Sequence, residues 1–245
     1  MNNYRLELCY DGTRYNGWQK LGSTGNTIQN KIETVLSRIL EQPVEVSASG
    51  RTDAGVHAKM QVCSFKTDSE KSCEEILEEL RKYLPADIGA INLLPAEPGF
   101  HARYNCTGKK YIYRIWTSPL PNVFERNYVY TYTDQLNVED MRKAAEMLCG
   151  KHDFSGFTSL KKSKKSTVRT IREIAIDEYP EEIRITACGD GFLYNMVRII
   201  VGTLIEIGNG KRPPDSIEEM LNSGVRANAG FTAPAKGLCL AEIYY

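Results

Sequence analysis

The chain has 245 residues, of which 42% are hydrophobic and 25% are charged. This composition is ordinary for a folded globular protein, and the length suits one large domain or two modest ones. Lysine and arginine together number 31, as do aspartate and glutamate, so the net charge gives no support for a nucleic-acid partner. Any binding of that kind must come from local patches.

The sequence lacks the features of a membrane or secreted protein. It contains no run of about 18 apolar residues, and its N-terminus, MNNYRLELCYDG, has neither the basic nor the apolar region of a signal peptide. Seven cysteines are spread along the chain without a Cys-x-x-Cys pattern, which argues against a disulfide framework and against a zinc site. We therefore expect a cytoplasmic protein with no membrane contact and no metal.

Hydrophobic periodicity predicts the elements of the first half of the chain. In order they are a strand over 4–10, a helix over 28–40, a strand, loop and strand over 44–66, a helix over 72–84 and a strand over 88–94. Asn26 or Thr27 caps the first helix, Ser72 begins the second, and Pro85 stops it. The order strand, helix, strand, strand, helix, strand is ferredoxin-like.

After a connector over 95–103 a similar order begins again. The pattern predicts a strand over 111–115, a helix over 138–148, paired strands over 168–178 and 182–188, a helix over 192–207 and a strand over 238–244. The order of elements repeats, although the sequence does not. We therefore predict an α+β protein with two halves, residues 1–104 and residues 105–245.

The stretch from Ser49 to Ala58, SGRTDAGVHA, is the strongest candidate site. It lies between two alternating apolar runs and holds Arg51 and Asp53 between glycines, where the backbone can bend tightly. A loop between strands needs turn residues, but it does not need this guanidinium and this carboxylate. The alternative is an ordinary turn with a solvated ion pair of little energetic consequence.

The string GRTDAGVHA resembles the active-site motif of the TruA-type tRNA pseudouridine synthases. Other blocks that resemble the family follow in the expected order and span nearly the whole chain. They are Tyr10-Asp11-Gly12 with Tyr15, Gly17, Trp18 and Gln19; Phe100-His101-Ala102-Arg103; Lys109-Lys110-Tyr111-Ile112-Tyr113; Met196 to Gly202; and Gly237-Leu238-Cys239-Leu240.

This resemblance implies a fold and an activity. The fold is two ferredoxin-like halves that form one continuous antiparallel sheet, with helices behind it and a central cleft. The enzyme is an intramolecular isomerase that converts uridine to pseudouridine in the anticodon stem-loop of tRNA, at positions 38 to 40, as a homodimer and without a cofactor. Asp53 is the catalytic nucleophile, and attack on the ribose C1′ and attack on the uracil C6 both stay open.

Arg198 is singled out by its surroundings. It is the only charged residue between Asp190 and Glu206, in a predicted helix that is apolar almost all round and therefore buried. A buried guanidinium is costly unless a carboxylate pairs with it, and we expect that partner to be Asp53. Arg51 and Arg198 would then keep Asp53 ionised and contact the substrate. The alternatives are a structural ion pair with another acid, or an arginine that emerges at the helix flank.

Tyr111 and Tyr113 share one face of a predicted strand in a basic, aromatic stretch. Chemistry on a base requires that it leave its stack, and an aromatic ring is the usual support for it. The resemblance assigns this substrate-binding role to Tyr111; the alternative is that both tyrosines are core. His57 and His101 we interpret as structural, because neither has a visible nucleophile partner.

A basic run without acids offers the local patch that RNA binding needs. Its members are Lys161, Lys162, Lys164, Lys165, Arg169 and Arg172, and we expect phosphate contacts from the four lysines and Arg169. A solvated loop is the alternative.

Two other functions stay open. A non-catalytic RNA-binding module would explain the aromatic and basic residues but not Asp53, and a small-molecule hydrolase would explain Asp53 but not the basic run.

Overall fold

The computed structural model describes residues 1–160 and 166–245 of the chain. The chain mixes strands that pair antiparallel with helices, which confirms the predicted α+β class. Contacts divide the chain into a first unit, Met1–Thr107 with Leu240–Tyr245, and a second unit, Gly108–Cys239. The sequence-based halves assign residues 240–245 to the second half, whereas in the structure they pack with the first. Within the described ranges, no helix is long and apolar enough to cross a membrane.

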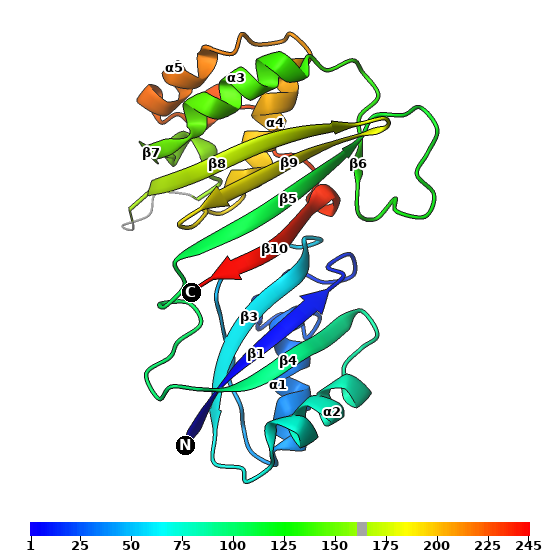
Figure 1. Ribbon diagram of the computed structural model, residues 1–245, viewed down its shortest axis with the longest axis vertical. Coiled ribbons are helices and arrows are strands. Elements are labelled where there is room, and N and C mark those ends of the chain that lie inside the picture. Colours follow the sequence, from blue (N-terminus) through cyan, green and yellow to red (C-terminus); the bar gives the residue numbers. More distant parts are fainter. Residues whose placement is uncertain (161–165) are drawn as a thin grey trace. The chain divides into compact units, whose positions relative to one another are not determined.

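The first unit is a sheet with two helices on one face (Figure 1). The strands β1 (Asn2–Tyr10), β3 (His57–Thr67) and β4 (Ile88–Ala96) pair antiparallel in the order β4-β1-β3. β2 (Ser47–Ala48) pairs with β3, and β10 (Leu238–Tyr244) lies next to β3 in the sheet. The helices are α1 (Ile28–Ile39) and α2 (Cys73–Tyr83).

Local chemistry explains where these two helices begin. The Thr27 side chain accepts a hydrogen bond from the Asn30 amide, and Ser72 forms a reciprocal capping box with Glu75. Both caps confirm the prediction. The strand expected between residue 44 and the motif loop is shorter, because only residues 47–48 are paired, although Val44 and Val46 are buried as the alternation requires.

Four strands of the second unit pair in the order β5-β9-β8-β7, antiparallel throughout. Its strands are β5 (Gly108–Trp116), β7 (Gly150–Asp153), β8 (Val168–Tyr179) and β9 (Glu182–Gly189), and β6 (Tyr130–Thr131) pairs parallel with β5. The helices are α3 (Val138–Leu148), α4 (Met196–Gly208) and α5 (Ser216–Ser223). The continuous sheet and the ferredoxin-like form of both halves stay predictions.

Helix α4 begins later than predicted. The apolar pattern extends back to Phe192, but Asn195 takes the left-handed conformation with φ of 61°, so the helix starts at Met196. Asparagine tolerates this conformation better than most residues. Within α4 every residue except Arg198 is buried, which confirms the prediction of a buried helix.

The chain after α5 packs against α4 backbone to backbone. A Cβ on Gly202 would lie 1.9 Å from the Phe231 carbonyl oxygen. A Cβ on Gly230 would meet the Thr203 backbone at 2.6 Å, and the Gly230 amide donates to Thr203 Oγ1 at 2.9 Å. These two glycines therefore let the 226–233 segment approach the helix more closely than a side chain would allow.

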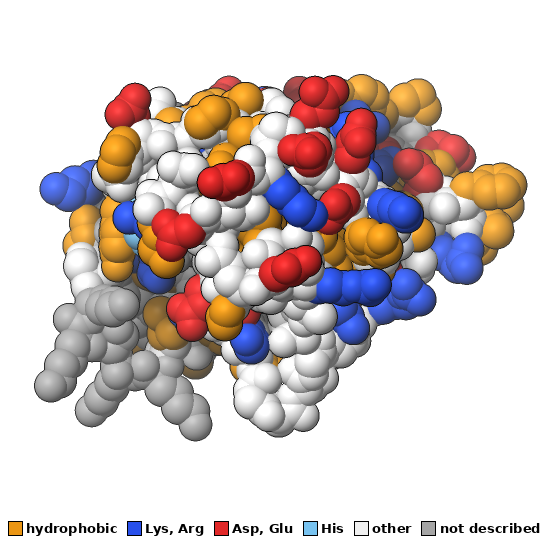
Figure 2. All heavy atoms as spheres, turned by 90° about the horizontal axis from the view of Figure 1, so that it is seen from below, with side chains coloured by type: hydrophobic (Ala, Val, Ile, Leu, Met, Phe, Trp, Pro, Cys, Tyr) orange, Lys and Arg blue, Asp and Glu red, His pale blue; other side chains and the backbone are white. Residues whose placement is uncertain are grey.

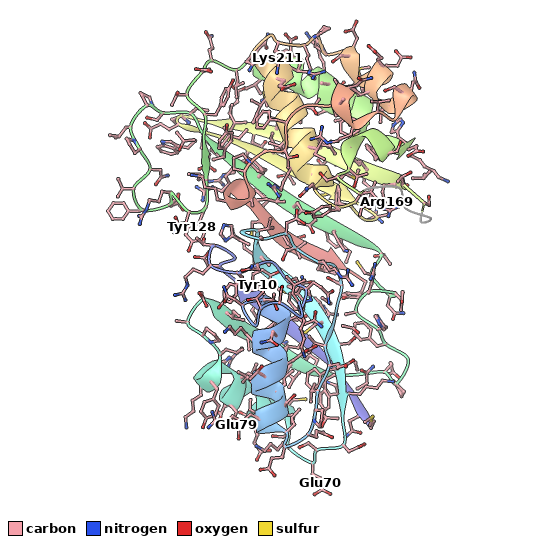
Figure 3. The ribbon with its side chains drawn as sticks, turned by 180° about the vertical axis from the view of Figure 1, so that it is seen from behind. Tyr10, Glu70, Glu79, Tyr128, Arg169 and Lys211 are labelled. Atoms are coloured by element: carbon pink, nitrogen blue, oxygen red, sulfur yellow. The ribbon has the colours of Figure 1, made fainter. Side chains whose placement is uncertain are left out.

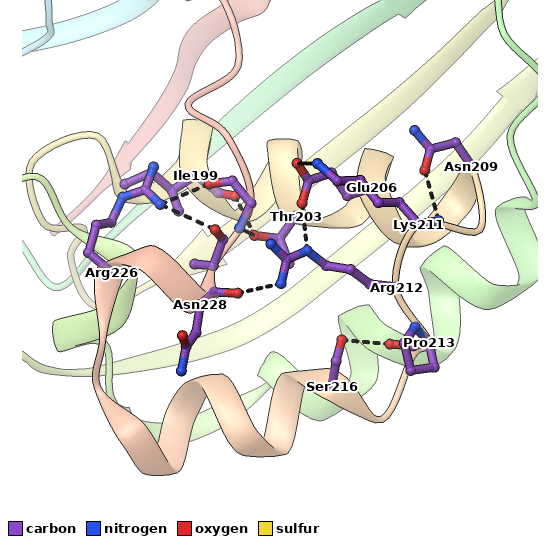
Figure 4. Close-up of polar contacts among 12 residues, drawn as sticks. Ile199, Thr203, Glu206, Asn209, Lys211, Arg212, Pro213, Ser216, Arg226 and Asn228 are labelled. Carbon is purple, nitrogen blue, oxygen red and sulfur yellow. Dashed lines mark hydrogen bonds and ion pairs between the residues drawn. The ribbon is translucent and has the colours of Figure 1, made fainter.

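Charged side chains hold the same segment in place (Figure 4). The buried Glu206 carboxylate accepts from Lys211 Nζ at 2.8 Å and Arg212 Nε at 2.6 Å, and Arg212 also donates to the Asn228 carbonyl at 2.6 Å. Burial by itself would raise the pKa of Glu206, but the hydrogen bonds from both cations bring that pKa below its usual value. Arg226 adds a hydrogen bond to the Gly230 carbonyl at 2.9 Å.

Gly202→Ala should destabilise the protein, because the added methyl group meets a backbone oxygen that this network keeps from moving. We expect the free energy of unfolding to fall by about 1 to 3 kcal/mol, as for overpacked cores. Gly22→Ala is the control, since a Cβ there meets nothing within 4 Å. Thermal or urea unfolding of both variants measures the difference. Equal stability of the two would mean that the 226–233 segment can withdraw from α4.

Candidate active site

The motif loop, residues 49–56, connects β2 to β3 in the first unit. Gly55 has φ of 78°, and the Val56 amide donates to the Asp53 carbonyl at 3.1 Å, which closes a tight turn. Asp53 is half-buried in this turn, and Arg51 is exposed. The loop thus holds its carboxylate at the surface of the unit, where a substrate can reach it.

A second loop, residues 11–18, supports the motif loop from behind. A Cβ on Gly12 would lie 2.0 Å from the Val56 carbonyl oxygen. Gly17, with φ of 89°, brings its backbone so close that a Cβ would lie 2.8 Å from the Thr52 carbonyl oxygen. The Trp18 amide donates to that same oxygen at 3.0 Å. Two blocks that are separate in the sequence therefore form one structure.

The supporting loop is itself anchored at Asp87, just before β4. The Tyr15 hydroxyl donates to Asp87 Oδ1 at 2.5 Å, and Arg14 Nη2 donates to Oδ2 at 2.6 Å. Burial followed by the hydrogen bond to Asp87 raises the pKa of Tyr15, so its hydroxyl stays protonated as a donor. The Asp11 amide adds a bond to the Asp87 carbonyl at 2.9 Å.

A buried polar network fixes the backbone on both sides of Arg51. Gln61, which is fully buried in β3, donates to the Gly50 carbonyl at 2.9 Å and accepts from Ser49 Oγ at 2.7 Å. Its amide also reaches the Tyr10 hydroxyl at 3.4 Å, and that hydroxyl lies 2.8 Å from Thr52 Oγ1. Figure 3 labels Tyr10, at the end of β1. The residue immediately before Asp53 is thus tied to the core by its side chain.

Sequence reasoning missed this network. Alternation places Gln61 on the face opposite Met60 and Val62, so its burial was not predicted, and a buried amide requires partners. His57 belongs to the same region: it is buried, and its Nδ1 accepts from the Gly12 amide at 3.0 Å. Asp11 Oδ1 is 3.1 Å from this nitrogen. Because a nitrogen that accepts from an amide carries no proton, Nδ1 cannot also donate to Asp11. The bond from Gly12 therefore gives His57 a structural role.

In the second unit, β5 places Tyr111 and Tyr113 on its buried face, as the alternation predicted. Tyr113 is fully buried and donates to the Pro234 carbonyl at 2.8 Å, so it belongs to the core. Tyr111 is 7% exposed, and its ring meets Phe192 edge to face with centroids 5.4 Å apart. Little of the Tyr111 ring is therefore open to a base in this structure.

Arg198 projects from the first turn of α4 and is half-buried. Its Nε donates to the Ala233 carbonyl at 2.7 Å, and its Nη1 donates to Asn195 Oδ1 at 3.0 Å. The Ala233 amide in turn donates to the Arg198 carbonyl at 3.0 Å. The 226–233 segment therefore orients this guanidinium. Its pairing with Asp53 stays a prediction.

Most of the predicted basic run lies outside the described residues, namely Lys161, Lys162, Lys164 and Lys165. Arg169, at the start of β8, donates to the Ser166 and Val168 carbonyls at 3.0 and 2.6 Å. Figure 2, a view from below, shows acidic and basic side chains interspersed on the face turned to the viewer. Nowhere in residues 1–160 and 166–245 do three His, Cys, Asp or Glu side chains gather so as to hold a metal ion.

Known proteins resemble this chain over its full length. A family profile described as tRNA pseudouridine synthase matches residues 9–105 and 144–245. A protein from Bacillus sp. (strain KSM-64), named tRNA pseudouridine synthase A, is 46% identical over 245 residues, which are 100% of both chains. A protein from Clostridium perfringens (strain 13 / Type A), named tRNA pseudouridine synthase A 2, is also 46% identical and also covers 100% of both chains.

Similarity to solved structures is weaker. A structure of a Cbf5-Nop10-Gar1 complex covers 82% of this chain and 45% of its own, with a TM-score of 0.36 and 13% identity, which is too little to carry an argument. The family profile and the full-length relatives, by contrast, confirm the resemblance found in the motifs: this chain belongs to the tRNA pseudouridine synthase family and, within it, to the TruA type.

Proposed function

We propose that this isomerase converts uridine to pseudouridine in the anticodon stem-loop of tRNA, at positions 38 to 40, with Asp53 as the nucleophile. The observation that carries the proposal is the construction of the motif loop. Two close approaches at glycines, a buried glutamine and a buried threonine hold the backbone around one half-buried carboxylate. So much support for a short surface loop is typical of a catalytic group that must be held in one geometry.

The reaction needs no outside reactant. The Asp53 carboxylate adds to C1′ of the ribose or to C6 of the uracil, and the bond between N1 and C1′ breaks. The base then turns, C5 bonds to C1′ as the carboxylate is released, C5 loses its proton, and N1 takes up a proton in place of its bond to C1′. Atoms and electrons balance within the nucleoside, so this route requires neither a metal nor a cofactor. Exclusion of water protects the detached base.

Three further side chains would handle the substrate. The exposed Arg51 guanidinium makes no hydrogen bond or ion pair with any described residue, so all its donors are available to an RNA phosphate. Arg198 is held in one orientation by Ala233 and Asn195, which suits a group that keeps Asp53 ionised. Tyr111 would support the extruded base, with its ring braced by Phe192.

We assign RNA backbone binding to Lys161, Lys162, Lys164, Lys165 and Arg169. In this proposal the protein works in the cytoplasm as a homodimer whose two subunits hold one tRNA.

Asp53→Asn should separate chemistry from binding. The amide is nearly isosteric but cannot act as the nucleophile, so pseudouridine formation should be abolished while tRNA affinity stays close to that of the parent. A product assay on bulk tRNA and filter binding measure the two quantities. As the reverse case, neutralising the four lysines should weaken binding and flatten the dependence of log affinity on log salt, by up to about 0.9 for each phosphate that is no longer neutralised. Catalysis by Asp53→Asn near the parent rate would refute the assignment of Asp53 as the nucleophile.

Tyr111 can be tested with a pair of substitutions. Tyr111→Phe keeps the ring and its packing on Phe192, whereas Tyr111→Ala removes both. If the ring alone supports the base, Phe should retain most tRNA modification and Ala should abolish it; if the hydroxyl takes part, both should fail. Full activity in both variants would place Tyr111 outside the site and leave it a core residue.

Substitutions of Thr52 test whether the buried network around Gln61 and Tyr10 positions Asp53. Thr52→Val keeps the shape but removes the hydroxyl that meets Tyr10, whereas Thr52→Ser keeps the hydroxyl. We expect Val to lower kcat on the order of 10-fold with little change in KM, and Ser to restore most of it, because small displacements of a catalytic group are costly. Tyr10→Phe should lower kcat by a similar factor, and the double variant Thr52→Val with Tyr10→Phe should lower it no further than either single variant. Parent kcat in Thr52→Val would assign the network to stability alone.

A further inference from the structure

We propose that the turn formed by residues 101–105 of the first unit is a second RNA-binding site, where Tyr104 stacks on an unpaired base and Arg103 contacts a phosphate. The base is distinct from the uridine that reacts. This inference rests on the proposed function for the identity of its ligand, a single-stranded segment of tRNA.

Tyr104 presents an open aromatic surface. Its side chain is 80% exposed, although its ring packs against the His101 ring at 4.3 Å between centroids and 37° between planes. His101 thus supports one side of the tyrosine, and the other side faces solvent. An exposed aromatic residue is ordinary by itself. A ring that is supported on one side and open on the other is the arrangement on which a base stacks.

Hydrogen bonds within the turn make its backbone rigid. The amides of Tyr104 and Asn105 both donate to the His101 carbonyl, each at 3.1 Å. The His101 amide donates to Asn105 Oδ1 at 2.7 Å, and the Arg103 amide donates to His101 Nδ1 at 3.1 Å. His101 is therefore both the support of the ring and the centre of the turn, and the turn is ordered before any ligand binds.

The turn is also fastened to the sheet that carries the motif loop. Ala102 is fully buried; its amide donates to Ser64 Oγ of β3 at 3.1 Å, and its carbonyl accepts from the Tyr245 hydroxyl at 2.9 Å. The Phe100 ring packs on Tyr245 at 5.2 Å between centroids. Ser64 is only two positions along β3 from Val62, whose carbonyl accepts from the Ser49 amide at the start of the motif loop. RNA held at the turn would thus be held beside the strand that follows the catalytic loop.

Arg103 supplies the charge that an RNA backbone requires. Its side chain is exposed, and the guanidinium makes no hydrogen bond or ion pair with any described residue. A cation next to an open aromatic ring matches one nucleotide, because the ring takes the base and the cation takes the phosphate. A protein partner would instead favour a wider apolar patch, and the exposed neighbours of Tyr104 are Arg103 and Asn105.

The test is the affinity of the full chain for an unmodified tRNA transcript, measured by filter binding. Tyr104→Ala should weaken binding by roughly 5- to 150-fold, the range found when a stacking aromatic is removed, and Tyr104→Phe should bind like the parent. Arg103→Gln should weaken binding and reduce its dependence on salt. Tyr83→Ala is the matched control, since Tyr83 is an exposed tyrosine of the same unit, 41% exposed, at the end of the acidic helix α2.

A direct readout of stacking comes from Tyr104→Trp, whose fluorescence should be quenched when the transcript binds, whereas that of Tyr83→Trp should not change. Equal affinities for Tyr104→Ala and the parent, or equal fluorescence responses at the two positions, would overturn the site and leave the proposed reaction intact. Inactivity of Asp53→Asn with normal binding tests only the reaction. A parent chain that does not bind tRNA at all would contradict both.

Discussion

The close approach of two loops at Gly12 and Gly17 is the constraint on which the candidate site depends. At both positions a side chain would collide with the backbone of the motif loop, so only glycine allows the loops to touch. Once they touch, backbone amides replace side chains as the groups that fix the loop, as in the bond from Trp18 to the Thr52 carbonyl. The side chains of the motif loop are then left to meet substrate. A loop held through its backbone can keep its geometry while its side chains do chemistry.

In the second unit, close backbone approach at glycines likewise positions a functional candidate, Arg198. There the helix α4 is buried on all sides, and Gly202 and Gly230 let the 226–233 segment lie directly on it. Ala233 of that segment then both donates to and accepts from Arg198. A charged side chain in an apolar helix is costly, and the Ala233 and Asn195 oxygens around Arg198 offset part of that cost. Glu206, two turns further along α4, bonds Lys211 and Arg212. These bonds help to hold the 226–233 segment where the Ala233 oxygen can accept from Arg198.

Much of the fold could be predicted from periodicity, and the site only in part. Helix α3 and strand β10 were predicted to the residue, because their apolar spacing and flanking residues agree. The start of α4 was predicted too early, since the turn at Asn195 depends on a backbone conformation that apolar spacing does not reveal. β7 and α5 were missed because both are short. The composition of the motif loop identified Asp53 and Arg51 as candidates, but the bonds from Tyr10 to Thr52 and from Gly12 to His57 join residues more than forty positions apart. No local pattern reports such pairs.

The pairing of residues 240–245 with the first unit has a consequence for synthesis of the protein. The Tyr245 hydroxyl donates to the Ala102 carbonyl, and the Tyr244 carbonyl accepts from the Thr107 amide, so the first unit is completed by residues that are made after the whole of the second unit. Contacts so distant in sequence form late and slowly. Residues 1–107 can therefore begin to fold early but reach their final form only after the second unit has been made. A chain that stops before residue 238 would carry the motif loop without β10 and Tyr245, so the turn at residues 101–105 would lack the hydroxyl that holds Ala102.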